Sequence, residues 1–179
     1  AFVTSMLQDR KGDMWFTTYG SGLYQWRRSP QDTAGILIQY VEENNFFCDY
    51  LMTMAEDKNG KLWIASDNNG ICSFEPAIDK TSATMVVYTE KEGMSSNYIH
   101  TLAVDEESNV WVGTSFDGLC RLTLSSGDQN GIFTQYGEKQ GLSSNTVTSI
   151  FPSRNTNNET EIWVSTTDGL NFLRSDTTS

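Results

Sequence analysis

Three aspartates recur at a fixed spacing and are the first candidates for chemistry. Asp9, Asp57 and Asp105 stand 48 residues apart. Such carboxylates could ligate a metal ion or act as general acids and bases. The first two, however, begin Asp-x-x-Gly sequences, in which the Asp caps its own turn and the Gly adopts a positive φ. Equivalent positions of a repeat also stand apart in space. We therefore predict turn caps, with no metal site, no cofactor and no catalytic residue here.

His100 is the only histidine in the sequence. The other repeats place Thr4, Met52 and Thr148 at its position, on the expected innermost strand. There it could contact a ligand, or it could be a hydrogen-bonded structural histidine. A Ser-His-Asp triad needs a base held against its nucleophile by a third group, and the spacing supports none. We keep His100 as a candidate ligand contact.

The three cysteines, Cys48, Cys72 and Cys120, form neither a CxxC motif nor a recognisable disulfide framework. Cys72 and Cys120 occupy the same place in successive repeats. This recurrence predicts small, buried, apolar side chains rather than a redox or metal site.

The overall charge excludes some partners. The chain has 12 Lys and Arg against 23 Asp and Glu, a net charge of −11. A nucleic-acid-binding protein needs a surplus of cations to displace counterions from phosphates, so we expect no nucleic acid partner. No apolar run approaches the roughly 20 residues that span a bilayer, so we expect no membrane contact within this chain. Ala1 already lies inside a repeat, and we interpret the chain as a piece of a longer protein.

A tryptophan marks each copy of the repeat. Trp15, Trp63, Trp111 and Trp163 are separated by 48, 48 and 52 residues. The four extra residues fall in the polar segment 153–160. A period of roughly 40 to 50 residues with four strands per repeat is typical of β-propeller blades.

Each repeat is predicted to hold four strands. The first strands are expected at Phe2–Gln8, Tyr50–Glu56, Tyr98–Val104 and Thr146–Pro152. The second strand holds the tryptophan, and a turn ending in Ser-Gly, Asn-Gly or Asp-Gly leads to the third. A variable polar loop precedes the fourth, as at Ile132–Tyr136. Several strands are apolar on both faces, which favours blades stacked face to face.

The expected fold is therefore all-β, with β-propeller blades of four antiparallel strands. The whole chain, 1–179, forms about four blades, at approximately 1–44, 45–92, 93–140 and 141–179, and the last lacks its fourth strand. We interpret the chain as an arc of a larger propeller. An isolated arc would expose two apolar blade faces, and such faces promote association. The expected partners are other blades of a parent propeller or a second copy of the chain in a homodimer.

Segments 97–119 and 141–150 resemble the two-component regulator propeller repeat. The resemblance extends over essentially the whole chain and is loosest in the fourth copy, whose first turn lacks the Asp and Gly. It implies a periplasmic sensor region of a hybrid histidine kinase, typical of gut Bacteroidetes and anchored in the inner membrane. It further implies the sensing of glycans or their breakdown products. The kinase and DNA-binding parts themselves are absent from this sequence.

Alternating strand directions place two kinds of loop at the same end of the blades. These are the turns between second and third strands and the connectors that precede first strands. Aromatic, amide and carboxylate side chains gather there, a combination that suits an oligosaccharide. Ordinary turn chemistry would explain the same residues. With His100, the candidate ligand-binding residues are Tyr19, Asp67, Asn68, Asn97, Phe116, Asp117, Asn145 and Asp168.

Three functions remain open at this point. The leading hypothesis is a non-catalytic sensor module that binds a glycan-derived signal and transmits it to a kinase elsewhere in the parent chain. The alternative is a protein-protein interaction scaffold. A propeller lyase or glycosidase is less favoured, because it would need a cluster of unlike acids, His or Arg.

Overall fold

The computed structural model describes residues 1–28, 34–42, 46, 48–76, 83–125 and 130–174. Most of the predicted variable loops, at 28–35, 76–83 and 125–131, lie outside these ranges. Four antiparallel sheets follow one another along the chain, and the strands of each sheet pair in chain order. The strands are β1 (Phe2–Gln8), β2 (Met14–Tyr19), β3 (Leu23–Arg27), β4 (Ile36–Tyr40), β5 (Leu51–Glu56), β6 (Leu62–Ser66), β7 (Ile71–Glu75), β8 (Thr84–Tyr88), β9 (Ile99–Val104), β10 (Val110–Thr114), β11 (Leu119–Thr123), β12 (Ile132–Tyr136), β13 (Val147–Arg154), β14 (Thr160–Thr166) and β15 (Gly169–Arg174).

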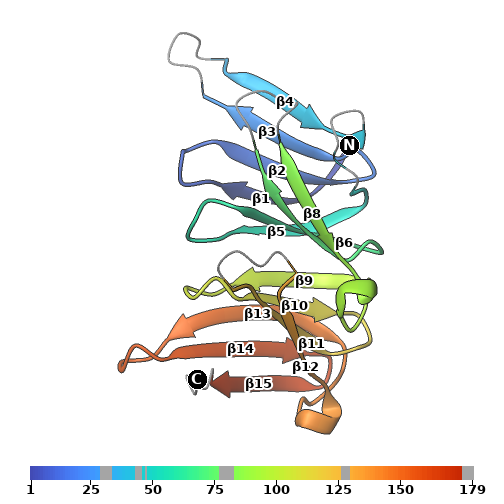
Figure 1. Ribbon diagram of the computed structural model, residues 1–179, viewed down its shortest axis with the longest axis vertical. Helices are drawn as coiled ribbons and strands as arrows, with labels where there is room; N and C mark the ends of the chain where they lie inside the picture. Colours follow the sequence, from blue (N-terminus) through green and yellow to red (C-terminus); the bar gives the residue numbers. More distant parts are fainter. Residues whose placement is uncertain (29–33, 43–45, 47, 77–82, 126–129, 175–179) are drawn as a thin grey trace.

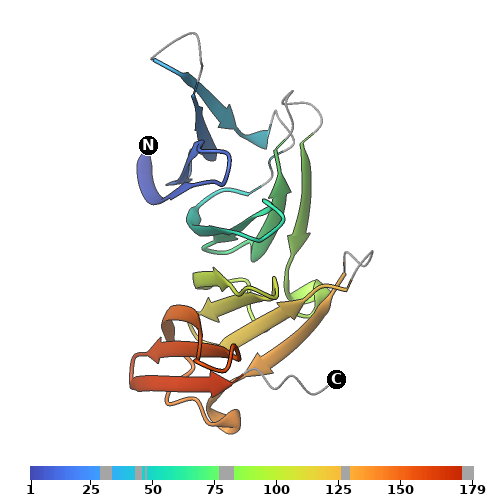
Figure 2. The same cartoon turned by 90° about the vertical axis from the view of Figure 1, so that its left-hand side faces the viewer.

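The sheets stack face to face in chain order, with the first and last at opposite ends of the stack (Figure 1 and Figure 2). Their first strands, β1, β5, β9 and β13, contact one another in succession. Within the residues that the structure describes, three sheets have four strands and the last has three. The all-β prediction of propeller blades with an incomplete final blade is confirmed, and the blades do not close into a ring.

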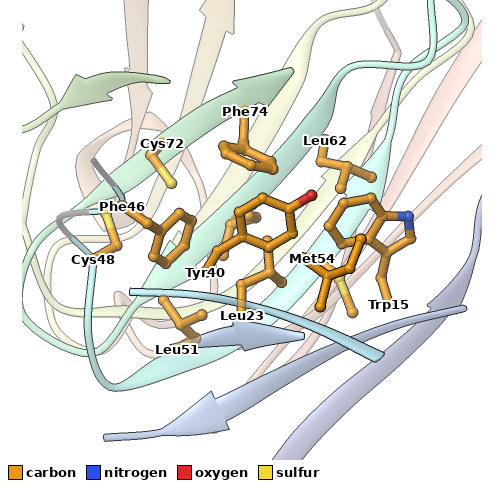
Figure 3. Close-up of a cluster of buried hydrophobic side chains, with 12 residues drawn as sticks. Trp15, Leu23, Tyr40, Phe46, Cys48, Leu51, Met54, Leu62, Cys72 and Phe74 are labelled. Atoms are coloured by element: carbon orange, nitrogen blue, oxygen red, sulfur yellow. The ribbon is translucent and has the colours of Figure 1, made fainter. Parts of the chain in front are cut away.

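An apolar core fills each gap between successive sheets. The first core joins Trp15, Leu23 and Tyr40 of sheet one to residues of sheet two such as Leu62 and Phe74 (Figure 3). Equivalent cores centre on Trp63 and Trp111 in the next two gaps. Both faces of an inner blade are therefore buried, which explains why its strands are apolar on both faces.

The recurring aspartates join the first turn of a blade to this core. Asp9 Oδ1 accepts hydrogen bonds from the backbone N–H groups of Lys11 and Asp13, at 2.9 Å each. Its other oxygen accepts from Trp15 Nε1 at 2.8 Å. Asp57 and Asp105 likewise accept from a turn N–H and from the tryptophan of their own blade. The turn-cap prediction is confirmed, and the cap has a second role of holding the buried indole.

In the fourth blade, the side-chain amide of Asn155 caps the equivalent turn in place of an aspartate. Asn155 Oδ1 accepts from the N–H groups of Asn157 and Glu159 at 2.9 and 3.0 Å. The strands around this turn are longer, so Trp163 lies eight residues after Asn155 rather than six. Trp163 packs on the ring of Phe172, with ring centroids 4.8 Å apart.

The three cysteines are buried, as predicted, and the structure has them as free thiols. Burial raises the pKa of the Cys120 thiol to about 11, so this group stays protonated at neutral pH. Two single-turn 3₁₀ helices that sequence inspection did not predict, η2 (Glu90–Glu92) and η3 (Glu138–Gln140), lie in the connectors before β9 and β13. Among the described residues, no helix is long and apolar enough to cross a membrane.

Candidate functional site

The two ends of the sheets differ, and we name each by its loops. The capped edge consists of the turns between first and second strands, at 9–13, 57–61, 105–109 and 155–159. The aromatic edge consists of the turns between second and third strands, at 19–22, 67–70, 115–118 and 167–168, together with the connectors at 48–50, 94–98 and 142–146.

Backbone hydrogen bonds place the turns and connectors of the aromatic edge together. Asp67 N donates to the carbonyl of Tyr50 at 3.0 Å, and Ser115 N donates to that of Tyr98 at 3.1 Å. Gly118 N donates to the carbonyl of Asn145 in the next blade at 2.8 Å. Because the second and third turns each bond to their own connector and to the next one, their exposed side chains form one surface across successive blades.

The turn glycines make this arrangement possible. Gly70 and Gly118 have φ values of 73° and 81°, which favour glycine. A Cβ atom at either position would collide with a carbonyl oxygen, that of Tyr88 or Tyr136 respectively. The turns therefore pack closely on the ends of the fourth strands.

Tyr19 and Asp67, predicted from two different blades, meet at this edge. The Tyr19 hydroxyl donates to Asp67 Oδ2 at 3.2 Å across 48 residues of sequence. This hydrogen bond and the negative charge of the carboxylate raise the pKa of the Tyr19 phenol above its ordinary value. The ring of Tyr19 also lies edge-on to that of Tyr50, with centroids 4.9 Å apart. The three side chains form a cluster that spans the first two blades.

Sequence inspection missed the aromatic side chains of the connectors. Phe2, Tyr50 and Tyr98 hold equivalent positions 48 residues apart, and all three are exposed. Tyr50 has a positive φ of 52°, which is uncommon for a non-glycine residue. The signal that could have found them is this recurrence of an aromatic residue next to each first strand.

Two predicted amides have structural roles. Asn97 Oδ1 accepts from Glu90 N at 3.0 Å, and its own backbone N–H donates to Glu90 Oε1 at 3.1 Å. Asn145 makes the same pair of bonds with Glu138, at 3.0 and 3.2 Å. The amide oxygens hold η2 and η3 against the connectors, so they are already engaged.

The turn tips present the remaining candidates to solvent. Phe116 is 71% exposed, and Asn68, Asp117 and Asp168 are exposed beside other turns. Thr114 Oγ1 accepts from the backbone N–H of Asp117 at 2.8 Å. This hydrogen bond stabilises the turn through the main chain of Asp117 and does not involve the Asp117 carboxylate. An apolar ring beside a carboxylate can stack on a sugar ring and accept from its hydroxyls.

His100 lies on β9, directly after the aromatic edge. Ile99 is buried while Tyr98 and His100 are exposed, as expected for alternating side chains along an extended backbone. His100 thus shares a side of the chain with Tyr98. The described residues bring no three His, Cys, Asp or Glu side chains together in a way that could hold a metal ion.

The capped edge holds its charges in internal pairs between blades. Arg154 Nε lies 2.7 Å from Glu106 Oε2, and Arg154 also pairs with Glu107. Arg154 and Glu106 border a small hollow of about 80 Å³ between the third and fourth blades. At the first gap, Arg10 Nη1 donates to the carbonyl of Lys58 at 2.8 Å. This edge therefore offers fewer unengaged groups than the aromatic edge.

Comparisons with known proteins agree with this architecture. The sequence profile of the two component regulator propeller matches residues 1–20, 45–68 and 93–116, which contain the first three Asp-Trp turns. A search of curated proteins returned no match.

Solved structures share the fold. The extracellular domain of a hybrid two component system of B. thetaiotaomicron is 21% identical, with a TM-score of 0.73 over 98% of this chain and 22% of that one. The extracellular domain of a one component system of the same organism is 22% identical, with a TM-score of 0.71 over 99% and 23%. A protein described as a gluconolactonase is 13% identical, with a TM-score of 0.61 over 97% and 58%. This chain spans less than a quarter of the length of the two extracellular domains.

Proposed function

Because the chain carries repeats of the two component regulator propeller family, we propose that it is a non-catalytic, ligand-binding part of a bacterial two-component sensor. The ligand is a glycan or a glycan-derived oligosaccharide, and it binds at the aromatic edge. The parent chain carries the bound signal to a kinase. The chain lies outside the cytoplasm, in the periplasm, a location supported by its likeness to extracellular domains.

The observation that carries the proposal is the line of exposed rings at one edge. Tyr19, Tyr50, Tyr98 and Phe116 come from three successive blades and stay in solvent, although aromatic burial is strongly favourable. The carboxylate of Asp67 accepts from the hydroxyl of Tyr19, and Asp117 lies beside Phe116 in the same turn. Rings for the apolar faces of sugars, with acceptors for their hydroxyl groups, are what an oligosaccharide site requires.

The recurring carboxylates have structural partners that argue against a catalytic role for them. Asp57 and Asp105 are buried, and their oxygens are engaged with turn N–H groups and indoles. The likeness to a gluconolactonase, at 13% identity, concerns the fold alone. A hydrolase or lyase would need unlike acids or a histidine beside an acid. The described residues place His100 next to Tyr98 instead.

Calorimetric titration of the chain with a panel of neutral and uronic-acid oligosaccharides tests this function. Products are analysed by chromatography in the same samples. We expect saturable binding of at least one member without cleavage. Cleavage would contradict the sensor and support an enzyme. Binding of none would favour the interaction scaffold.

Replacing Tyr50 by Ala sharpens the assignment. The lost ring should weaken binding about tenfold, which corresponds to about 1.4 kcal/mol. The matched control is Ile132→Ala, because Ile132 is 66% exposed but belongs to the outer strand β12, away from the aromatic edge. Equal affinity of the two variants would place the sugar elsewhere.

A further inference from the structure

Two of the three cysteines share one apolar core, and the third belongs to the next. Cys48 and Cys72 lie in the cluster between the first and second blades, whereas Cys120 lies in the cluster between the second and third. Cys48 is 1% exposed, and the other two are fully buried. Because the second sheet separates these two cores, Cys48 and Cys72 are the pair that can meet.

Aromatic packing sets Cys48 opposite Cys72. Cys48 lies in the connector before β5, and Cys72 lies on β7. The ring of Phe46 packs edge-on against that of Phe74, with centroids 5.5 Å apart. The residue two places before one cysteine thus touches the residue two places after the other. Figure 3 shows both cysteine side chains at the same end of the cluster, beside Phe46.

Hydrogen bonds on the other side of the pair hold the connector to the same sheet. Ser66 Oγ donates to the carbonyl of Asp49 at 2.6 Å. The backbone N–H of Ser66 donates to the carbonyl of Gly70 at 2.9 Å. Asp49 directly follows Cys48, and Gly70 precedes Cys72 by two residues. The two cysteines are therefore bracketed by contacts on both sides.

The two thiols are also hydrogen-bonded to each other. This hydrogen bond lowers the pKa of the Cys48 thiol, and the same bond together with burial raises the pKa of the Cys72 thiol. The thiolate is the reactive form of a cysteine. Cys48 is therefore suited to react first with an oxidant, and Cys72 to attack the product.

The third blade lacks such a pair although it repeats one of the cysteines. Cys120 is the counterpart of Cys72, but Ser96 stands where the second blade has Cys48. The thiol of Cys120 lies beside Ser95. A serine cannot form a disulfide. Among the described residues, the second blade is thus the one that brings two sulfur atoms together.

We propose that Cys48 and Cys72 are a redox pair that closes an intramolecular disulfide under oxidising conditions. The Cys48 thiolate attacks a small disulfide such as glutathione disulfide, forms a mixed disulfide and releases one glutathione. The Cys72 thiolate then attacks the Cys48 sulfur and releases the second glutathione. Two electrons pass from the protein to the oxidant, and the two protons from the protein thiols are balanced by the two glutathione thiols that form.

The bond fastens the connector to the blade. Its sulfurs lie about 2.05 Å apart, closer than hydrogen-bonded thiols. Cys48 lies outside the strands, so the connector can supply this movement. The cross-link restricts the unfolded chain between residues 48 and 72, which stabilises the fold. It also anchors the connector that carries Tyr50 at the aromatic edge.

Refolding in a glutathione buffer tests the pair, because both thiols are sealed in the folded chain. The reduced, urea-unfolded chain is diluted into reduced and oxidised glutathione, and free thiols are then alkylated with iodoacetamide. Trypsin separates the three cysteines, since Lys58 and Lys91 lie between them. Mass spectrometry should show the peptides of Cys48 and Cys72 joined, with the loss of two hydrogen atoms, and Cys120 alkylated.

The matched variants are Cys48→Ser and Cys120→Ser. Oxidation should shift urea denaturation of the wild type and of Cys120→Ser to higher urea concentrations, and leave that of Cys48→Ser unchanged. Three alkylated cysteines in the refolded wild type, a disulfide that includes Cys120, or a link between two chains would overturn the proposal. The peptide map of the wild type decides this even if a variant fails to fold.

Discussion

Asp105 and Asp117 lie in the turns at opposite ends of β10, and the first carboxylate is buried while the second is exposed to solvent. Asp105 is 5% exposed, and its oxygens accept from Asn109 N, Asn109 Nδ2 and Trp111 Nε1. Asp117 is exposed in a turn, next to Phe116. The first three blades engage Asp9, Asp57 and Asp105 at the capped edge, whereas Asp117 and Asp168 are exposed at the aromatic edge and Asp67 is half-exposed beside Tyr19.

This difference shows that a residue can recur in every blade either for a structural role or at an exposed surface position. A residue that recurs with its hydrogen-bond partner, such as Asp9 with Trp15, serves the blade itself. A residue that recurs without burial, such as Tyr50 with Tyr98, gains little stability from its position. Exposed rings at successive blades are therefore the stronger indication of a ligand surface.

Replacing Asp105 by Ala should cause the largest loss of stability. The change leaves the buried indole N–H of Trp111 without its acceptor and removes the turn cap, so the free energy of unfolding should fall by about 2–4 kcal/mol. Urea denaturation followed by tryptophan fluorescence measures it. Asp117→Ala is the matched control and should stay within about 0.5 kcal/mol of wild type. Similar losses of stability from both variants would contradict the contrast between the buried Asp105 and the exposed Asp117.

Replacing Arg154 by Gln tests the ion pairs of the capped edge, and its expected loss of stability is smaller than that of the Asp105 variant. The side chains of its partners Glu106 and Glu107 are 73% and 45% exposed, so the loss should be only about 0.2–1 kcal/mol. The loss should shrink as salt rises, because mobile ions screen exposed charges. Denaturation at low and high ionic strength gives the measurement, with Lys139→Gln in η3 as control. A large, salt-independent loss would instead indicate a packing role for Arg154.

The smallest effect expected is a titration shift at the aromatic edge. The hydrogen bond to Asp67 raises the pKa of Tyr19, so the phenol remains protonated to a higher pH than an isolated tyrosine. Asp67→Asn should bring this pKa back toward its ordinary value, because the negative acceptor is lost. Ultraviolet absorbance titrations, with Tyr19→Phe to identify the signal, follow the change. An unchanged pKa would show that the pair does not form in solution.

The sequence was most informative where local chemistry repeats. Asp-x-x-Gly and Asp-Gly turns together with the tryptophan spacing predicted the strands, because these turns depend on a few adjacent residues. The fourth turn was harder to interpret, since Asn155 replaces the Asp and longer strands shift Trp163.

The site depends on contacts that no local pattern specifies. The sequence predicts Asn97 as a ligand contact, whereas in the structure its amide oxygen and backbone N–H bond to Glu90, seven residues earlier. The pattern predicts Tyr50 as the start of a strand, but β5 begins at Leu51, and Tyr50 has a positive φ and packs on the ring of Tyr19. Burial also depends on neighbouring blades, so Met6 looks like Met54 in sequence yet lies in solvent.

The most direct test of the contrast between the two edges is an amide chemical-shift map of the chain during titration with an oligosaccharide that binds it. The perturbed amides should cluster in the aromatic edge, around Tyr19, Tyr50, Asp67, Tyr98 and Phe116. Amides of the capped edge, around Asp57 and Asp105, should stay unchanged. Perturbations centred on the capped edge, or none at the aromatic edge under saturation, would contradict the account.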